Sequence, residues 1–474
     1  MRQNKQPSYE SGNLVMSQKP IKVLIICHGH PDINPGGGEI ASYNLHKRLN
    51  ETEGYESLFF ARHDQPDLIH GGTPFSGTGK PNEVLFYVPM GDWFKFSQPD
   101  HPKIWRDFRE CLESYKPDVV HFHHYVHLGL EMIREVKNYK PNLPVVLTLH
   151  EYFGICHNHG QMVKTSSGRV CHTSSPAACS NCFPKYSSQD FFLRKQFIQS
   201  FFNLVDRFIS PSEFLKNRYM QWGLKDEDIV VIENIDLTDH AVCEKPQLQY
   251  ADSENNSVND QSKSEIGSRG GQRNKVMLSY FGQINSFKGI DILLDAVALL
   301  SKSIKNNLLV NIHGSGLENN SEELKKYITG AVKKSNGIIR LCGRYERSEL
   351  EDLMGSTDWV IIPSKWWENS PMVILEAKKY AVPVIASNIG GMKEKIIDGE
   401  TGLHFQMGRP DSLADMIQFV VENPEYQKKM ASNIGEEYHP ENDYNKHLML
   451  YKNVLSDCNE NTDDSGSTSL NQAA

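Results

Sequence analysis

Two glutamates flank a polar-to-apolar transition in the stretch WWENSPMVILEAKKYAVPVIAS, residues 366–387. We expect Glu368 to lie in a loop. Glu376 follows eight positions later, just over one turn into a helix expected to begin at Pro371. Both carboxylates can then face one cavity and accept hydrogen bonds from two sets of hydroxyls on a polyhydroxylated ligand. The spacing alone is more often that of two solvated surface glutamates.

The start of the same helix offers a second means of recognition. Proline has no N–H to leave unpaired, so Pro371 suits the first turn of a helix. The N–H groups of Met372 and Val373 then point out of the helix together with the positive end of its dipole. Anionic or hydroxyl-rich ligands bind well at such a helix start.

Two further stretches could contribute to the same site. Lys288, in FGQINSFKG, directly precedes an expected helix at 289–301 and can place a positive charge on a phosphate. A solvated loop lysine is the alternative. Gly314, in IHGSG, follows an expected strand, where the backbone can approach a flat ligand closely.

Four cysteines form a separate cluster between residues 156 and 182. Cys156, Cys171, Cys179 and Cys182 are separated by fourteen, seven and two residues, and the last pair is a C-x-x-C motif. Four thiolates favour a structural zinc site over an iron–sulfur cluster. A redox disulfide or four unrelated thiols remain as alternatives.

Short apolar runs alternate with helical patterns along most of the chain, which predicts α/β architecture with parallel sheets. We expect two Rossmann-like, doubly wound domains that face each other across a cleft, with the ligand at the carboxyl ends of the strands. The expected strands are 22–27, 118–122, 145–149, 206–209, 229–232, 275–281, 307–313, 338–342, 358–362 and 383–386, and the expected C-terminal-domain helices are 289–301, 321–334, 347–355 and 371–380.

Changes in composition suggest where the domains end. The stretch 244–274 has few apolar residues and many Ser, Asn and Gly, which is typical of a linker or insertion. The expected order is a disordered leader at 1–20, an N-terminal domain at 21–243, this linker, a C-terminal domain at 275–437, a helix at 438–456 that packs back on the N-terminal domain, and a disordered tail at 457–474.

Taken in chain order, FGQINSFKG, IHGSG, ENSPMVILEA, PVIAS and GGMKEKIIDGETGLHF resemble the family 4 retaining glycosyltransferases, which have the GT-B fold. The resemblance extends over about residues 21–452 and implies that 21–243 is the acceptor domain and 275–437 the nucleotide-sugar domain. It implies transfer of a hexosyl-type group from a nucleotide diphosphate sugar to a saccharide or lipid-linked acceptor, with retention at the anomeric carbon. It further implies a role in polysaccharide or glycoconjugate biosynthesis and no obligatory catalytic metal.

The resemblance also assigns roles to residues. Glu376 would bind the ribose, Glu368 and the amides after Ser370 the donor sugar, and Lys288 the diphosphate. His150, in TLHEYF, would orient the donor sugar, and the glycine loop PGGGE would lie near the donor phosphates or the acceptor. The implied catalytic set is His150, Glu368 and Lys288; the donor-binding set is Gly37, Gly38, Gln283, Lys288, Gly314, Glu368, Asn369, Ser370, Pro371, Met372, Val373 and Glu376.

One departure from the family leaves alternatives open. Gln283 stands where the family often has an arginine, so a second cation at the diphosphate is missing or comes from elsewhere. A catalytically degenerate nucleotide-sugar-binding protein and a GT-B-fold nucleotide-sugar epimerase are therefore the alternatives.

The remaining features of the sequence limit the possible location and partners of the protein. A net charge of -9 does not favour nucleic acid as a partner. The chain has no export signal and no apolar run long enough to cross a bilayer, so we expect a cytoplasmic protein.

The segment 191–204, FFLRKQFIQSFFNL, suggests either a buried helix or a peripheral contact with the inner face of a membrane. The four histidines of VHFHHYVH suggest a metal site or, more simply, packing at a strand end and contact with the acceptor.

Overall fold

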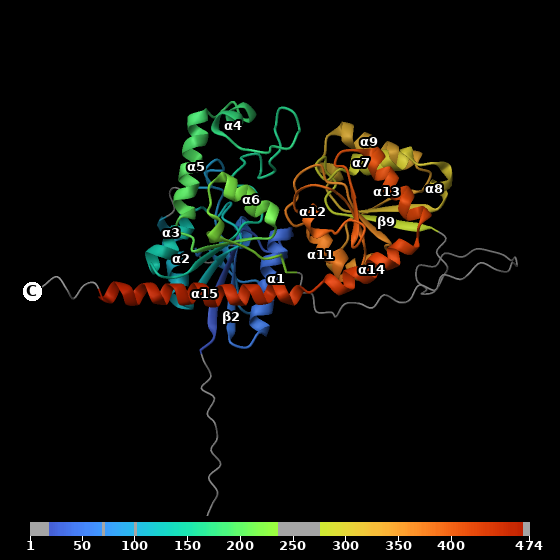
Figure 1. Cartoon of the computed structure of the whole chain (residues 1–474). Coiled ribbons are helices and arrows are strands. Elements are labelled where there is room, and N and C mark those ends of the chain that lie inside the picture. Colours follow the sequence, from blue (N-terminus) through green and yellow to red (C-terminus); the bar gives the residue numbers. More distant parts are fainter. Residues whose placement is uncertain (1–18, 69–71, 99–101, 236–274, 468–474) are drawn as a thin grey trace, which may run out of the picture.

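The computed structural model describes residues 19–68, 72–98, 102–235 and 275–467, which form two α/β domains side by side (Figure 1). The expected linker at 244–274 and most of the expected leader lie outside the described residues. Among the residues that are described, no helix combines the length and the apolar character needed to cross a membrane.

The N-terminal domain is built on an eight-stranded sheet in the order β3-β4-β2-β1-β5-β6-β7-β8. Strand β3 pairs antiparallel with β4, and the other neighbouring pairs are parallel. The strands are β1 Ile21–Cys27, β2 Tyr55–His63, β3 Phe75–Ser76, β4 Glu83–Tyr87, β5 Val119–Phe122, β6 Val145–Thr148, β7 Arg207–Ser210 and β8 Ile229–Val231.

The C-terminal domain has a parallel sheet of six strands in the order β11-β10-β9-β12-β13-β14. In both domains the first strand lies inside the sheet, with later strands added on each side, as in doubly wound folds. The strands are β9 Val276–Phe281, β10 Leu308–His313, β11 Ile339–Gly343, β12 Trp359–Ile362, β13 Val384–Ser387 and β14 Gly402–Phe405.

Helices flank both sheets, which explains why central strands such as β1, with the sequence IKVLIIC, are almost continuously apolar and buried. The helices are α1 Gly37–Glu51, α2 Pro102–Tyr115, α3 Glu131–Tyr139, α4 Pro176–Cys182, α5 Ser188–Phe202, α6 Glu213–Trp222, α7 Ile290–Leu299, α8 Lys302–Asn306, α9 Glu322–Lys334, α10 Leu350–Gly355, α11 Met372–Lys379, α12 Gly390–Lys395, α13 Pro410–Glu422, α14 Glu425–Glu437 and α15 Pro440–Ser467.

Strands β2, β3, β4 and β14 were not among the expected strands. Charged residues interrupt β2, at Glu56 and Arg62, and β4, at Glu83, so neither strand is a continuous apolar run in the sequence. Strands β3 and β14 have only two and four residues. Pairing with neighbouring strands, which a local pattern does not reveal, places all four in their sheets.

The last helix, α15, leaves the C-terminal domain and lies across the N-terminal domain (Figure 1). The Tyr451 hydroxyl lies 2.7 Å from Nδ1 of His121 on β5, and the Tyr444 hydroxyl lies 2.5 Å from Oγ1 of Thr52. The helix continues to Ser467, so the expected boundary at 456, with a disordered tail from 457, is wrong. No proline interrupts residues 457–467, so the helix is not blocked there.

The contact between α15 and the N-terminal domain can be tested by a pair of substitutions on the same helix. Tyr451 is fully buried, so Tyr451→Ala should lower the free energy of unfolding by about 3–5 kcal/mol, through a cavity and the lost partner of His121. Met449 is 63% exposed, and Met449→Ala should change stability by less than about 0.5 kcal/mol. Denaturant unfolding of the full chain measures both. Equal effects would mean that α15 adds no packing energy.

Candidate functional site

Three segments that are far apart in the sequence meet between the two domains. A β-carbon placed on Gly38, at the start of α1, would lie 3.5 Å from the ring of His150, which follows β6. A β-carbon placed on Gly37 would lie 3.4 Å from Cγ of Met372, the first residue of α11. The glycine loop, the histidine turn and the start of α11 therefore converge, as a site between the domains requires.

The carboxylate of Glu368 is the best-held polar group at this place. The residue is 6% exposed, and its Oε1 accepts hydrogen bonds from Nζ of Lys288 at 2.6 Å, Oγ of Ser364 at 2.8 Å and Nε1 of Trp366 at 2.8 Å. Burial of a carboxylate is tolerated only with such partners. The residues expected to bind sugar and diphosphate separately, Glu368 and Lys288, are thus paired with each other in this structure.

Close backbone contacts bring the loops around Lys288 and Glu368 together. Gly289 has a φ of 71°, and a β-carbon there would lie 1.8 Å from the carbonyl oxygen of Pro363, at the end of β12. A β-carbon on Gly391 would lie 1.6 Å from the carbonyl oxygen of Asn369. Only glycine fits at either position. The lysine loop and the start of α12 can therefore press directly against the loop that carries Glu368.

The other donor-binding candidates lie around this loop. Glu376 is buried in α11, and burial, followed by the charge of Glu376, raises the pKa of the Tyr345 hydroxyl. Gln283 is exposed, and its carbonyl oxygen accepts a hydrogen bond of 2.6 Å from the hydroxyl of Tyr280. A β-carbon on Gly314 would lie 1.8 Å from the carbonyl oxygen of Gly282, so the chain after β10 lies in close contact with the chain after β9.

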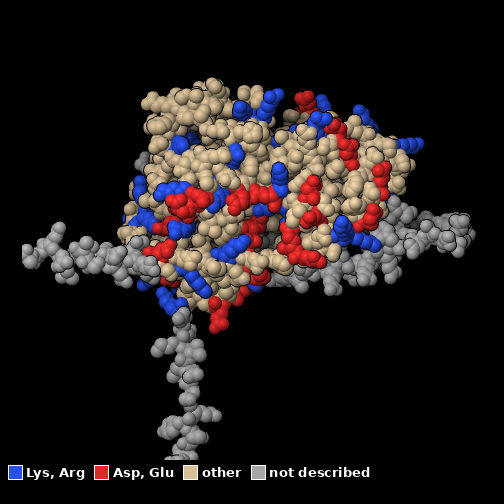
Figure 2. Space-filling model, in the orientation of Figure 1, with Lys and Arg blue, Asp and Glu red and all other residues tan. Residues whose placement is uncertain are grey.

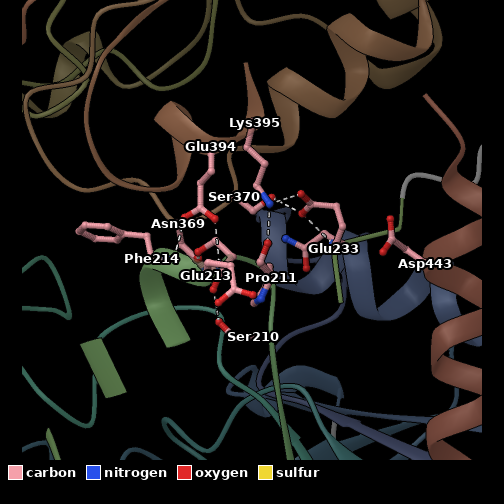
Figure 3. A network of polar contacts seen from close by, with 12 residues as sticks. Ser210, Pro211, Glu213, Phe214, Glu233, Asn369, Ser370, Glu394, Lys395 and Asp443 are labelled. Atoms are coloured by element: carbon pink, nitrogen blue, oxygen red, sulfur yellow. Dashed lines mark hydrogen bonds and ion pairs between the residues drawn. The ribbon is translucent and has the colours of Figure 1, made fainter. Parts of the chain in front are cut away.

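Asn369 and Ser370 form contacts between the domains (Figure 3). The Asn369 side chain accepts a hydrogen bond from the hydroxyl of Ser212, and its Nδ2 donates to the carbonyl oxygen of His150 at 3.0 Å. Oγ of Ser370 donates to Oε1 of Glu233 at 2.5 Å. Both side chains were expected at the donor; in this structure they join the loop of Glu368 to the N-terminal domain.

Helix α12 supplies a second set of contacts across the boundary, and Figure 3 shows Glu394 and Lys395 pointing from it toward the N-terminal domain. The carboxylate of Glu394 accepts hydrogen bonds from the backbone N–H groups of Glu213 at 2.9 Å and Phe214 at 2.6 Å. These are the first residues of α6, so a carboxylate of one domain caps a helix of the other. Lys395 forms an ion pair with Glu233.

The N-terminal side of the site is rich in buried imidazoles. Nδ1 of His123 lies 3.0 Å from Nε2 of His150, and burial, followed by the charge of His28, lowers the pKa of His150 to about 3. Nε2 of His28 lies 3.1 Å from Oε1 of Glu39, and burial raises the pKa of Glu39 to about 7. Burial also lowers the pKa of His28 to about 4. These rings are therefore neutral at pH 7.

The four histidines of VHFHHYVH have roles in packing. His121 lies between the hydroxyls of Tyr451 and Thr148, at 2.7 and 2.8 Å, and Nδ1 of His124 accepts hydrogen bonds from two backbone N–H groups. Among the described residues, no three His, Cys, Asp or Glu side chains lie close enough together to hold a metal ion. Packing at a strand end, the simpler of the two interpretations, accounts for these contacts.

Several polar residues of the site were not expected from the sequence. Glu394 belongs to GGMKEKIIDGETGLHF, His123 to VHFHHYVH and Glu39 to PGGGE, although none of these residues was assigned to the site. A signal for Glu233 is that its stretch, VIENID, departs from the Pro-Asn-Gly turn of many family 4 relatives. Glu39 adjoins the glycines of PGGGE, and a carboxylate so near a helix start could have been noted.

Comparison with known families agrees with this architecture. The model of "Glycosyltransferase Family 4" matches residues 35–235, and that of "Glycosyl transferases group 1" matches residues 263–436. The chain belongs to the family 4, group 1 glycosyltransferases. The family expected from the sequence motifs is therefore confirmed, and the two models correspond to the N-terminal and C-terminal parts of this glycosyltransferase.

Solved structures show the same fold at low sequence identity. HepE of Anabaena, solved with UDP and glucose, aligns with a TM-score of 0.59 and 16% identity over 91% of this chain and 99% of its own. Sucrose-phosphate synthase of Thermosynechococcus elongatus aligns with a TM-score of 0.62 and 18% identity over 92% of this chain and 99% of its own. These alignments confirm the expected GT-B fold.

Curated relatives match only part of the protein. An uncharacterized glycosyltransferase of Methanocaldococcus jannaschii is 30% identical over 174 residues, which are 36% of this chain and 46% of that protein. The matched stretch thus spans less than half the length of this relative. Sequence similarity of this extent supports the family and leaves the donor and the acceptor to be argued from the site.

The cap that α12 provides to α6 predicts an effect on domain closure. Glu394→Ala removes the carboxylate that accepts the first N–H groups of α6, and loss of such a cap costs about 1 kcal/mol. The equilibrium should shift toward open forms by about fivefold, measured as a larger radius of gyration in small-angle scattering. Lys393→Ala, at an exposed position of the same helix, is the control. An unchanged radius for Glu394→Ala would show that the cap does not hold the domains together.

The buried histidines predict that acid destabilises the protein. Their folded-state pKa values lie below the unfolded value of about 6.5, so the unfolded chain takes up protons first as the pH falls. Each such group removes on the order of 1 kcal/mol per pH unit below about 6.5. The groups with lowered pKa values include His28, His46, His121, His123, His124, His150 and His447.

Denaturant unfolding at about pH 7.5 and about pH 5.5 should therefore give a smaller free energy of unfolding at the lower pH. Glu39 acts in the opposite direction, because its raised pKa adds stability below about pH 4.5 that is lost as the pH rises through about 7. Glu39→Gln should make the acid-induced loss steeper. Equal stability at both pH values would contradict neutral burial of these rings.

Proposed function

We propose that this protein is a retaining glycosyltransferase that moves a sugar from a nucleoside diphosphate sugar to a hydroxyl of a saccharide or lipid-linked acceptor. The observation that carries the proposal is the meeting of the Lys288–Glu368 pair, the start of α11, the glycine loop and His150 between two domains of this family. HepE was solved with UDP, which makes uridine diphosphate sugars the first donors to try.

The donor would enter by exchange of an ion pair. Lys288 now neutralises Glu368, and a diphosphate with more than one negative charge competes for the same ammonium group. When Lys288 turns to the diphosphate, Oε1 of Glu368 becomes able to accept hydroxyl groups of the sugar. The N–H groups at the start of α11 would hold the phosphate or the sugar, and Glu376, inside the same helix, the ribose.

Chemistry would follow from charge stabilisation and alignment. The bond from the anomeric carbon to the diphosphate breaks, the acceptor oxygen forms a bond on the same face, and its proton passes to the departing diphosphate. Lys288 and the helix start would stabilise the negative charge that develops there. The contacts of Asn369, Ser370 and Glu394 would keep the domains closed, which aligns donor and acceptor and limits access of water.

His150 would act as a positioning group beside the donor sugar. Its ring is neutral, and one ring nitrogen contacts His123. The other ring nitrogen can form a hydrogen bond with a sugar hydroxyl without adding charge to the site. The two alternatives drawn from the sequence, a degenerate binding protein and an epimerase, are not favoured by the comparisons.

The acceptor would approach from the N-terminal domain. Helix α5 buries Phe191, Phe201 and Phe202 against that domain but exposes 52% of Phe192 and 48% of Leu193. In the view of Figure 2, charged residues are sparse over the part of the molecule that holds α4 and α5. Such a surface is compatible with a lipid-linked acceptor and with peripheral contact at a membrane.

Calorimetric titration with UDP and with uridine tests the role of Lys288. Lys288→Gln should weaken UDP binding by about tenfold or more, because one charge-assisted contact is lost, and should leave uridine binding within about twofold. Lys302→Gln, at an exposed position of α8, removes the same charge outside the site and is the control. Equal weakening of both ligands would place Lys288 away from the phosphates.

The reaction itself is tested with a panel of nucleotide sugars and saccharide acceptors. The expected product has the anomeric configuration of the donor, assigned by nuclear magnetic resonance. An inverted product would overturn the retaining mechanism but not the transferase activity. A sugar nucleotide converted without any acceptor would favour the epimerase.

A further inference from the structure

The segment between β6 and α5 contains a site that the glycosyltransferase proposal does not use. It holds only one short helix, α4, and one isolated bridge between Val163 and Val170. Stretches this long with so little regular structure usually need a further means of stabilisation. A hydrogen bond of 2.6 Å from the Cys171 N–H to the Met162 carbonyl closes the loop at this bridge, and Arg194 and Arg218 donate to carbonyl oxygens on either side of this loop.

All four cysteines of this segment line one cavity of about 30 Å³. Cys179 and Cys182 stand three residues apart in α4 and so lie on one side of this helix. Cys156 and Cys171 come from the irregular chain that precedes α4. All four are free thiols. His157 also lines the cavity, and its Nδ1 is buried without a hydrogen-bond partner among the described residues.

A buried cation beside this cavity gives an independent reason to expect negative charge there. Arg194, on α5, is 3% exposed and donates to the carbonyl oxygens of Phe94, Gly154 and Phe153 at 2.7, 2.8 and 2.6 Å. No carboxylate within the described ranges forms an ion pair with it. Its guanidinium lies within electrostatic range of Cys156 and Cys179. Carbonyl oxygens and the faces of Phe94 and Phe96 surround the guanidinium, and a negatively charged metal–thiolate centre nearby would supply a counterion.

We propose that Cys156, Cys171, Cys179 and Cys182 bind one zinc ion as a structural site. Each of the four thiols loses its proton and forms one Zn–S bond, which gives a tetrahedral centre of net charge −2 next to Arg194. With four protein ligands the ion has no open position, so its role is structural rather than catalytic. No three ligand side chains in the described part of the chain are yet close enough to hold an ion, so the sulfurs must move inward to Zn–S distances of about 2.3 Å.

The position of this site links it to the donor loop. Cys171 precedes His172, whose ring packs edge-on against Trp367 of the C-terminal domain with centroids 5.0 Å apart. The carbonyl oxygen of His172 accepts a hydrogen bond of 2.7 Å from Arg218. Trp367 is the neighbour of Glu368. An ion that fixes Cys171 therefore fixes a contact one residue away from the buried carboxylate of the donor site.

Elemental analysis of the full chain, purified without added metal and dialysed against a weak chelator, tests the proposal directly. About one zinc per chain is expected. Cys179→Ser should lose most of the zinc and unfold at a lower temperature, because metal binding and folding of such segments are coupled. Cys342→Ser, at an exposed position of β11, should change neither. Replacement of zinc by cobalt should give the visible spectrum of a tetrahedral thiolate centre.

Three results would overturn the proposal: a metal-free chain with four reactive thiols in this segment, a disulfide among them found by mass spectrometry, or full zinc content in Cys179→Ser. If Cys179→Ser does not fold, stepwise modification of the thiols in the wild-type protein replaces it. Zinc should then be released in proportion to modification of these four cysteines. These readouts do not depend on glycosyl transfer, so they stand or fall separately from the proposed function.

Discussion

The fixed position of the Glu368 carboxylate is the constraint on which the arrangement of the site depends. A buried carboxylate requires donors, and Lys288, Ser364 and Trp366 all converge on one of its oxygens. The loop after β12 is thereby held in one conformation. Gly289 and Gly391 then allow two neighbouring segments to press against that loop. A side chain at either glycine would separate segments whose contact the carboxylate needs.

From this loop, hydrogen bonds extend across the boundary between the domains. Asn369 and Ser370 follow Glu368 directly and reach Ser212, the His150 carbonyl and Glu233 of the N-terminal domain. In the view of Figure 2, acidic side chains gather near the boundary between the domains. Figure 3 shows Glu233 beside Lys395 and Glu394 at the start of α6. Helix α15 forms a second link, because it carries the chain back over the N-terminal sheet. Two separate connections therefore hold the two domains together.

The sequence predicted what depends on local chemistry. Buried parallel strands such as β1 and β9 read as apolar runs, and the motifs around Lys288 and Glu368 pointed to the family that the comparisons confirm. It did not predict contacts that depend on how the domains meet, such as Glu394 with the first N–H groups of α6. Nor did it predict that Lys288 and Glu368 would neutralise each other, because their separation of 80 positions gives no local signal. The roles of individual site residues stay predictions until ligands are measured.

The distribution of charge between the domains has a consequence for group transfer. On the N-terminal side, His28 and His150 are neutral at pH 7, and Glu39, with a pKa of about 7, is partly protonated. On the C-terminal side, Lys288 forms an ion pair with the buried Glu368. In the proposed function, Lys288 is the cation that the diphosphate contacts, while on the other side Arg62 lies within electrostatic range of His28. In the same proposal, the neutral imidazoles of the N-terminal side would meet the acceptor hydroxyl, which is recognised by hydrogen bonds rather than by charge. The proposed separation of roles between the domains would thus rest on burial of the imidazoles on one side and of a paired carboxylate on the other.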